Sequence, residues 1–169
     1  MNSNQFATRL ATPDDFAGVD ALLRASYPTL MARAYDPAVL EPALELMARA
    51  NPKLLACGTY YVAAAGELIV GCGGWTREYP GKTEVQPELA HLRHFGTHPQ
   101  WTQRGIGRAI YHLCETAARA AGVRTFECHA SLNGEPFYRA LGFLTIEGFE
   151  IPLGPDLRMP SLLMRRQIC

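Results

Sequence analysis

The chain has 169 residues, the size of one domain, and a chain of this length buries roughly 70% of its unfolded surface when it folds. Hydrophobic residues make up 48% and charged residues 19%, an ordinary globular composition that excludes disordered, collagen-like and repeat proteins. Sixteen basic residues balance sixteen acidic ones, so no overall field attracts nucleic acid or an anionic membrane. We therefore expect a single domain over residues 1–169, without a nucleic-acid partner.

Cysteine usage and hydropathy bear on the compartment. The five cysteines are odd in number and form no CxxC pair, which favours a reducing compartment over a disulfide framework, so we expect a cytoplasmic protein. The N-terminal residues lack the apolar run of a signal peptide, and the longest uncharged run, residues 54–66, is too short to span a bilayer. Because the histidines and cysteines are dispersed, we also expect no metal site.

Two helices are predicted first in the chain. Residues 12–15 carry a helix-start signal, an N-cap threonine followed by proline and acidic residues, before apolar positions at helical spacing. Residues 36–37 repeat the signal before a second helix that runs to about Ala50. Between the two helices we expect a loop rich in aromatic residues over residues 27–35.

Strands alternate with helices in the rest of the chain. A helix from Gly105 is the clearest of these elements, since its apolar residues share one face and Gly122 supplies a C-terminal cap. We further expect strands over residues 59–64, 67–72, 89–97, 123–130, 143–151 and 161–166, and a short helix over residues 135–140. This order of elements predicts one α/β domain with a mixed sheet.

A glycine-rich helix start is the strongest chemical signal. Gly105 and Gly107 allow backbone amides to approach an anion closely, and the helix N-terminus adds a favourable dipole. The sequence therefore predicts a phosphate or pyrophosphate site at residues 103–108.

Two other phosphate-binding patterns fail. A dinucleotide fingerprint requires a third glycine where Ile110 stands. Residues 81–83 imitate the end of a Walker loop, but Thr76 occupies the place of its first glycine and Pro87 follows where a helix should begin. We interpret residues 77–87 as a surface loop.

Two segments resemble the GCN5-related N-acetyltransferase (GNAT) superfamily. Residues 103–107, Gln-Arg-Gly-Ile-Gly, resemble its acetyl-CoA motif, usually written Q/R-x-x-G-x-G/A, with Thr102 in the first position. Residues 133–143 resemble its N-x-x-A-x-x-F-Y-x-x-x-G-F block, with Pro136 in place of the alanine, a tolerable change at a helix start. The whole chain also fits the family's order of elements.

The resemblance implies a fold and a co-substrate. It implies a mixed, mostly antiparallel central sheet flanked by helices, whose fourth and fifth strands splay apart to hold acetyl-CoA. The pyrophosphate would bind at residues 103–108, and the pantetheine arm would pair with backbone near Thr97. The implied cofactor-binding residues are Phe95, Thr97, Gln103, Arg104, Gly105, Ile106, Gly107, Arg108, Asn133 and Phe137.

Acetyl transfer to an amine requires a deprotonated amine and a proton for the departing thiolate. The resemblance implies Tyr138 as the proton donor and His91 as the base, because His91 matches a strand position where arylalkylamine-acetylating members carry histidine. Strand alternation would place His91, Arg93, Phe95 and Thr97 on one face and His94 on the other. His94 or a water relay is the alternative to His91.

The leading hypothesis is an enzyme that moves the acetyl group to a primary amine of a small molecule or peptide by direct attack. A non-catalytic CoA-binding sensor is the alternative. The resemblance implies an acceptor pocket built from residues 27–35, 75–87 and 151–160, where Tyr27, Tyr35, Trp75 and Tyr79 suggest an apolar or aromatic amine. The identity of the amine, the preferred acyl group and the oligomeric state, a homodimer included, stay open.

Overall fold

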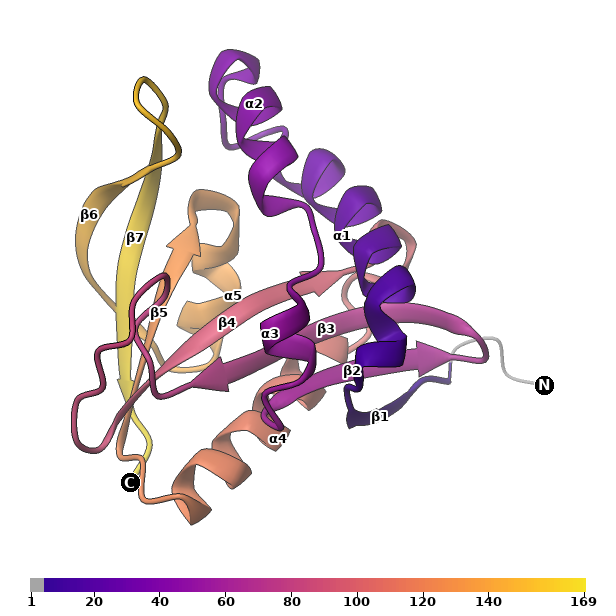
Figure 1. Cartoon of the computed structure of the whole chain (residues 1–169), viewed down its shortest axis with the longest axis vertical. Coiled ribbons are helices and arrows are strands. Elements are labelled where there is room, and N and C mark those ends of the chain that lie inside the picture. The colour runs from indigo at the N-terminus through magenta and orange to yellow at the C-terminus, as the bar shows by residue number, and fades with distance from the viewer. Residues whose placement is uncertain (1–4) are drawn as a thin grey trace.

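A computed structural model describes residues 5–169 and contains one seven-stranded sheet with helices on both faces (Figure 1). The strands lie in the order β1-β2-β3-β4-β5-β7-β6, and every neighbouring pair is antiparallel except β4 and β5. The strands are β1 (Ala7–Leu10), β2 (Tyr60–Ala65), β3 (Leu68–Thr76), β4 (Leu89–Thr97), β5 (Thr125–Ser131), β6 (Leu144–Pro152) and β7 (Arg158–Gln167). The helices are α1 (Phe16–Met31), α2 (Pro37–Met47), α3 (Pro52–Leu55), α4 (Ile106–Ala120) and α5 (Glu135–Ala140).

The helices divide between the two faces of the sheet. In Figure 1 α1, α2 and α3 lie on the face toward the viewer, the front face, and α4 and α5 lie on the back face. Leu22 and Leu23 of α1 pack in the front core, and Ile106 and Ile110 of α4 pack in the back core. Helices α1 and α4 each turn an apolar stripe to the sheet, so apolar burial on both faces of the sheet stabilises the α/β fold. The predicted fold class is confirmed.

The aromatic loop predicted over residues 27–35 is wrong in its first half, because α1 continues to Met31 and carries Pro28 inside it. A proline inside a helix costs about 3 kcal/mol, which argues for a helix end in a sequence read alone. In the fold, Leu23, Tyr27 and Met31 follow one another at four-residue spacing and pack inward. Their burial outweighs the cost of Pro28, which is exposed.

Two short elements were not predicted. Strand β1 has four residues, most of them exposed, and owes its conformation to antiparallel pairing with β2 rather than to an apolar pattern of its own. Helix α3 also has four residues and is started by the Asn51 side chain, which accepts a hydrogen bond from the amide of Lys53. Neither element displaces a predicted one. None of the helices between residues 5 and 169 combines the length and apolar content needed to cross a membrane.

The splay expected between the fourth and fifth strands is present. Only three residue pairs join β4 to β5, and the last of them is His91 with Glu127. Beyond this pair the two strands diverge, as Figure 1 shows. The remainder of β4, through Thr97, therefore has no strand partner on the β5 side, and a space opens in the middle of the sheet.

Candidate active site

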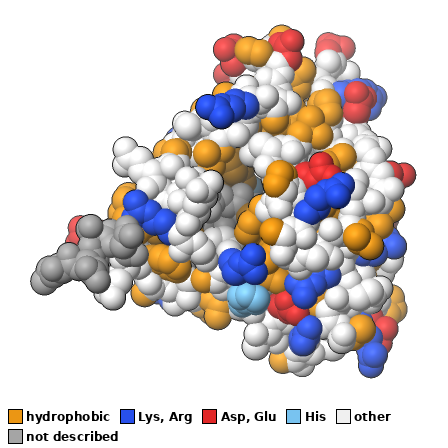
Figure 2. All heavy atoms as spheres, turned by 180° about the vertical axis from the view of Figure 1, so that it is seen from behind, with side chains coloured by type: hydrophobic (Ala, Val, Ile, Leu, Met, Phe, Trp, Pro, Cys, Tyr) orange, Lys and Arg blue, Asp and Glu red, His pale blue; other side chains and the backbone are white. Residues whose placement is uncertain are grey.

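A cavity of about 900 Å³ occupies the opening between β4 and β5. On the back face it is bounded by the start of α4 and by α5, and on the front face by α1, α2, β6 and β7. Figure 2 shows the back face, which is hollowed near its centre with hydrophobic side chains in the hollow. The cavity therefore reaches both faces of the sheet through the gap between β4 and β5.

Ten of the twelve residues predicted for the site line this cavity, which the predicted elements bring together from three parts of the chain. They are Phe95, Thr97, Gln103, Gly105, Ile106, Gly107, Arg108, Asn133, Phe137 and Tyr138. The other two predicted residues, Arg104 and His91, do not line it. The guanidinium of Arg104 instead lies 4.5 Å from the ring centroid of Trp101 and donates a hydrogen bond to the Gln100 carbonyl.

The glycine turn before α4 has the backbone that an anion site requires. Gly105 has φ 80°, a left-handed conformation that glycine adopts without steric cost, and it is the N-cap of α4. The amides of the first helical turn have no partner within the helix and point toward an N-terminal ligand. At Gly107 a Cβ would lie 2.9 Å from the Phe137 ring, so this glycine lets α4 and α5 pack closely.

Tyr138 lies in an aromatic cluster beside the cavity. Its ring contacts those of Phe95, Phe137 and Phe143 at centroid distances of 6.3, 5.1 and 5.6 Å. Burial raises the pKa of the Tyr138 hydroxyl well above its ordinary value, so the phenol carries its proton at neutral pH. Within residues 5–169 this hydroxyl makes no hydrogen bond, which leaves it available to a bound molecule.

A β-bulge in β4 overturns the predicted alternation of faces. Cys72 pairs with Gly96 and Gly74 pairs with Arg93, so His94 and Phe95 together oppose Gly73 alone. His94 has φ 55°, and its ring turns to the front face, where Nε2 lies 2.9 Å from the Met47 carbonyl oxygen. His91 and His94 therefore share the front face, while Phe95 packs with α5 behind the sheet.

Two tyrosine hydroxyls donate hydrogen bonds to the backbone carbonyl groups at the bulge. The hydroxyl of Tyr60 donates a hydrogen bond of 3.0 Å to the carbonyl of His94, and that of Tyr27 donates one of 3.0 Å to the carbonyl of Phe95. A buried carbonyl without a partner would be costly, so these hydroxyls stabilise the bulge next to the cavity.

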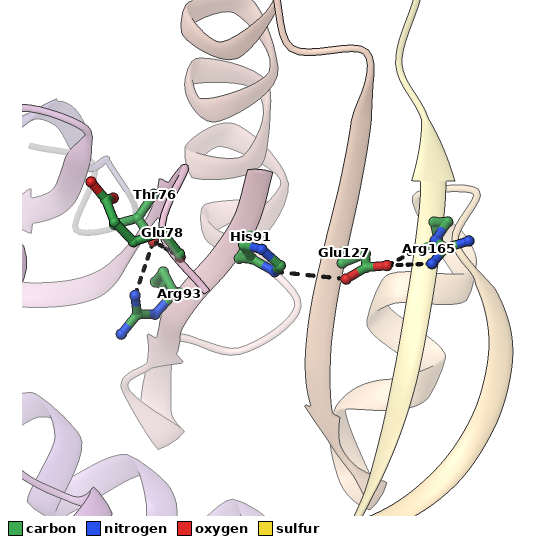
Figure 3. A network of polar contacts seen from close by, with 6 residues as sticks. All are labelled: Thr76, Glu78, His91, Arg93, Glu127 and Arg165. Carbon is green, nitrogen blue, oxygen red and sulfur yellow. Dashed lines mark hydrogen bonds and ion pairs between the residues drawn. The ribbon is translucent and has the colours of Figure 1, made fainter. Parts of the chain in front are cut away.

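His91 is buried and does not belong to the cavity lining. Only 2% of the residue is exposed, and its Nδ1 lies 3.8 Å from Oε2 of Glu127 without a hydrogen bond (Figure 3). Oε1 of Glu127 accepts a hydrogen bond of 2.9 Å from Nε of Arg165 on β7. Burial lowers the pKa of His91, although the carboxylate of Glu127 opposes that effect.

The loop between β3 and β4, expected to form part of the acceptor pocket, contributes no described residue to the cavity lining. Its Tyr79 ring instead lies 5.2 Å from the ring centroids of both His91 and His129. Trp75 is buried in the back core, and the hydroxyl of Tyr35 donates to the Pro160 carbonyl. Of the four aromatic residues thought to suggest an aromatic acceptor, only Tyr27 lines the cavity.

His129 on β5 is the residue that sequence reasoning missed. It lines the cavity, its ring lies 4.9 Å from that of Phe149, and it makes no hydrogen bond within the described part of the chain. Burial lowers the pKa of His129, so the imidazole is neutral near pH 7. Its place in the cavity lining depends on how β4 and β5 diverge, which no local sequence pattern records. Alternation along residues 127–131 was the one available signal, since it gives Glu127 and His129 a common face.

The family assignment follows from a domain profile. Residues 56–144, more than half of the chain, match the acetyltransferase (GNAT) domain. The chain belongs to the GNAT family. No curated protein matches the sequence significantly. The matched residues include the glycine turn and the whole segment 133–143 around Tyr138, both of which contribute to the cavity lining.

Solved structures share the GNAT fold of this chain at low sequence identity. A GCN5-related N-acetyltransferase from Rhodopseudomonas palustris is 20% identical, with a TM-score of 0.76 over 95% of this chain and 94% of that one. The PaiA N-acetyltransferase from Thermoplasma acidophilum, solved with coenzyme A, is 14% identical, with a TM-score of 0.71 over 96% and 99%. A Drosophila melanogaster polyamine N-acetyltransferase is 15% identical, with a TM-score of 0.65 over 96% and 100%.

Proposed function

We propose that this GNAT protein transfers the acetyl group of acetyl-CoA to a primary amine of a small molecule or peptide by direct nucleophilic attack. The observation that carries the proposal is that one cavity joins an anion-binding glycine turn, the unpaired edge of β4 and the hydroxyl of Tyr138. Of the named relatives, PaiA was solved with coenzyme A and the Drosophila enzyme is named for acetylating polyamines, which supports the co-substrate and the amine chemistry.

The chain's own groups have distinct roles in this proposal. Amides at the start of α4 bind the pyrophosphate, because the helix dipole and unpaired N–H groups favour an anion there. The edge of β4 up to Thr97 offers backbone groups to the pantetheine arm. Acetyl-CoA supplies an activated thioester, and Tyr138 donates its phenolic hydrogen to the sulfur as the thiolate departs. No covalent acyl-enzyme is required.

The amine's proton needs an acceptor that lies in the cavity, which His91 does not. His94 lines the cavity, but its Nε2 is engaged with the Met47 carbonyl. His129 lines the cavity with neither ring nitrogen hydrogen-bonded among the described residues. We therefore assign the proton acceptance to His129. His91 stays a candidate for the far end of a relay, because Tyr79 contacts both rings. A cytoplasmic location stays a prediction from cysteine usage.

Gln103→Glu tests the cofactor site by changing charge with almost no change of shape. The carboxylate would lie at the turn where the pyrophosphate binds, so we expect the Kd for acetyl-CoA, measured by calorimetry, to rise at least about tenfold. Gln100→Glu is the matched control, because Gln100 is exposed and does not line the cavity. Equal affinity in both variants would remove the turn from the site. Cofactor binding without acetylation of any amine would favour the sensor.

A further inference from the structure

Large apolar side chains form much of the lining in the front half of the cavity. The lining there comes from four elements and includes Leu30, Met31, Met47, Ile151 and Met159. Three of the chain's five methionines are in this group. Methionine is flexible and polarisable, and its sulfur makes favourable contacts with aromatic rings, so this lining adapts to an apolar ligand of variable shape.

The same lining lacks carboxylates. Among residues 5–169 no Asp or Glu lines the cavity, and the one permanently charged residue that does is Arg108 at the start of α4, on the back face. The polar side chains of the front half are uncharged at neutral pH. They are Ser26, Tyr27, His94, His129, Ser131 and Ser161. An ammonium group in this half would therefore find no anionic partner.

The absence of an anionic partner affects the binding of monoamines and of diamines differently. An alkylamine has a pKa near ~10.4 in water, as a lysine side chain does, and only its neutral form attacks a thioester. A lining that desolvates the ammonium favours the neutral, reactive form of the amine that is acetylated. A second ammonium on the same molecule would be desolvated without reacting and without a partner, which weakens binding.

We propose that the acceptor is a primary monoamine carried on an apolar alkyl or arylalkyl body, and that diamines and polyamines are poor substrates. The inference rests on the proposed acetyltransferase function and adds the substrate class. It depends on the lining of the cavity and not on the loop aromatics, most of which lie elsewhere.

Hexylamine and 1,6-diaminohexane form the sharpest pair of substrates, because they share a six-carbon chain and differ by one amino group. We expect kcat/KM for hexylamine, measured by release of the CoA thiol, to exceed that for the diamine at least about 100-fold. Calorimetry on the protein loaded with CoA should show the same order of affinity. This second measurement reports acceptor binding whether or not turnover occurs.

Carboxylates introduced into the lining should reverse the preference. Met47→Glu and Ile151→Glu place one carboxylate on opposite sides of the front half, and we expect each to lower the monoamine-to-diamine ratio at least about tenfold. Using both variants guards against an effect of Met47→Glu on the neighbouring His94. Leu46→Glu is the control, because Leu46 is 60% exposed on the same helix and should leave the ratio unchanged.

Each outcome has one meaning. Equal or better use of the diamine by the unmodified protein would overturn the substrate class while leaving acetyl transfer intact. A ratio unaffected by both lining variants would also overturn it. If neither amine binds, and no amine or peptide is acetylated although acetyl-CoA binds, the acetyltransferase function itself fails.

Discussion

The proposed role of Tyr138 as proton donor rests on the burial of its hydroxyl as well as on its position in the cavity lining. Because burial raises its pKa well above the ordinary value, no loss of rate from its ionisation is expected below about pH 10. Tyr138→Phe keeps the ring and its packing but removes the proton. We expect kcat to fall about 100-fold while the Kd for acetyl-CoA changes less than about threefold, in steady-state and binding measurements. Tyr61→Phe, outside the cavity lining, is the matched control. Full turnover by Tyr138→Phe would make Tyr138 a packing residue.

The proposed role of His129 as a base predicts a rate that rises with pH, whereas a proton donor such as Tyr138 loses activity when it ionises at high pH. A base must lose its proton to act, so kcat/KM should rise with pH through the pKa of His129, which burial lowers below its usual value near ~6.5. Glu127 opposes that shift and Arg93 reinforces it, while Tyr79 and Phe149 contact the ring. His129→Gln should remove the acid limb of the profile and slow the reaction at pH 7 by about 10- to 100-fold.

The other two histidines of the front face discriminate between mechanisms. His94→Gln and His91→Gln should keep the acid limb if His129 accepts the proton directly. Loss of the limb in His91→Gln alone would restore the base expected from the family's strand position. A limb that persists in all three variants would indicate a water relay.

At the scale of elements, local patterns predicted whatever depends on neighbours in sequence. The amphipathic face of α4 and the glycine turn before it are encoded within about fifteen residues, and both lie where the sequence placed them. The end of α1 was misjudged, because the burial that offsets Pro28 comes from residues far along the chain. Strand β1 was missed for the same reason.

The bulge in β4 determines which face of the sheet the residues from His94 onward occupy, and the periodicity of the sequence does not predict it. Alternation predicts that His94 faces away from His91, yet the extra residue opposite Gly73 reverses the faces from His94 onward. A non-glycine residue at positive φ costs about 1 kcal/mol or more, and Tyr27 and Tyr60 from other elements help to offset that cost. The sequence therefore predicts which strand carries the site but not which histidine of that strand reaches the cavity.

At the scale of the whole molecule, the front face combines a ligand cavity with three partly or fully buried imidazoles, His91, His94 and His129. Burial lowers the pKa of each in the folded protein. The unfolded chain, whose histidines titrate near ~6.5, then binds more protons than the folded chain over the window just below that pH. Stability consequently rises with pH across this window, and acidification favours unfolding.

We expect the melting temperature to fall by several degrees between pH 7 and pH 5, given a scaling of about 2–4 °C per kcal/mol for a chain of this length. Asp15 and Asp20, whose pKa values are lowered chiefly by hydrogen bonds from Arg9 and the Ala50 amide, lose their contribution only at lower pH. His94→Gln should therefore flatten the melting profile between pH 7 and pH 5, although it lowers stability at pH 7 by removing the contact with Met47. His112→Gln, on α4 and outside the front-face cluster, is the matched control substitution. A slope equal in the unmodified protein and in His94→Gln would show that this imidazole titrates alike in the folded and unfolded chains.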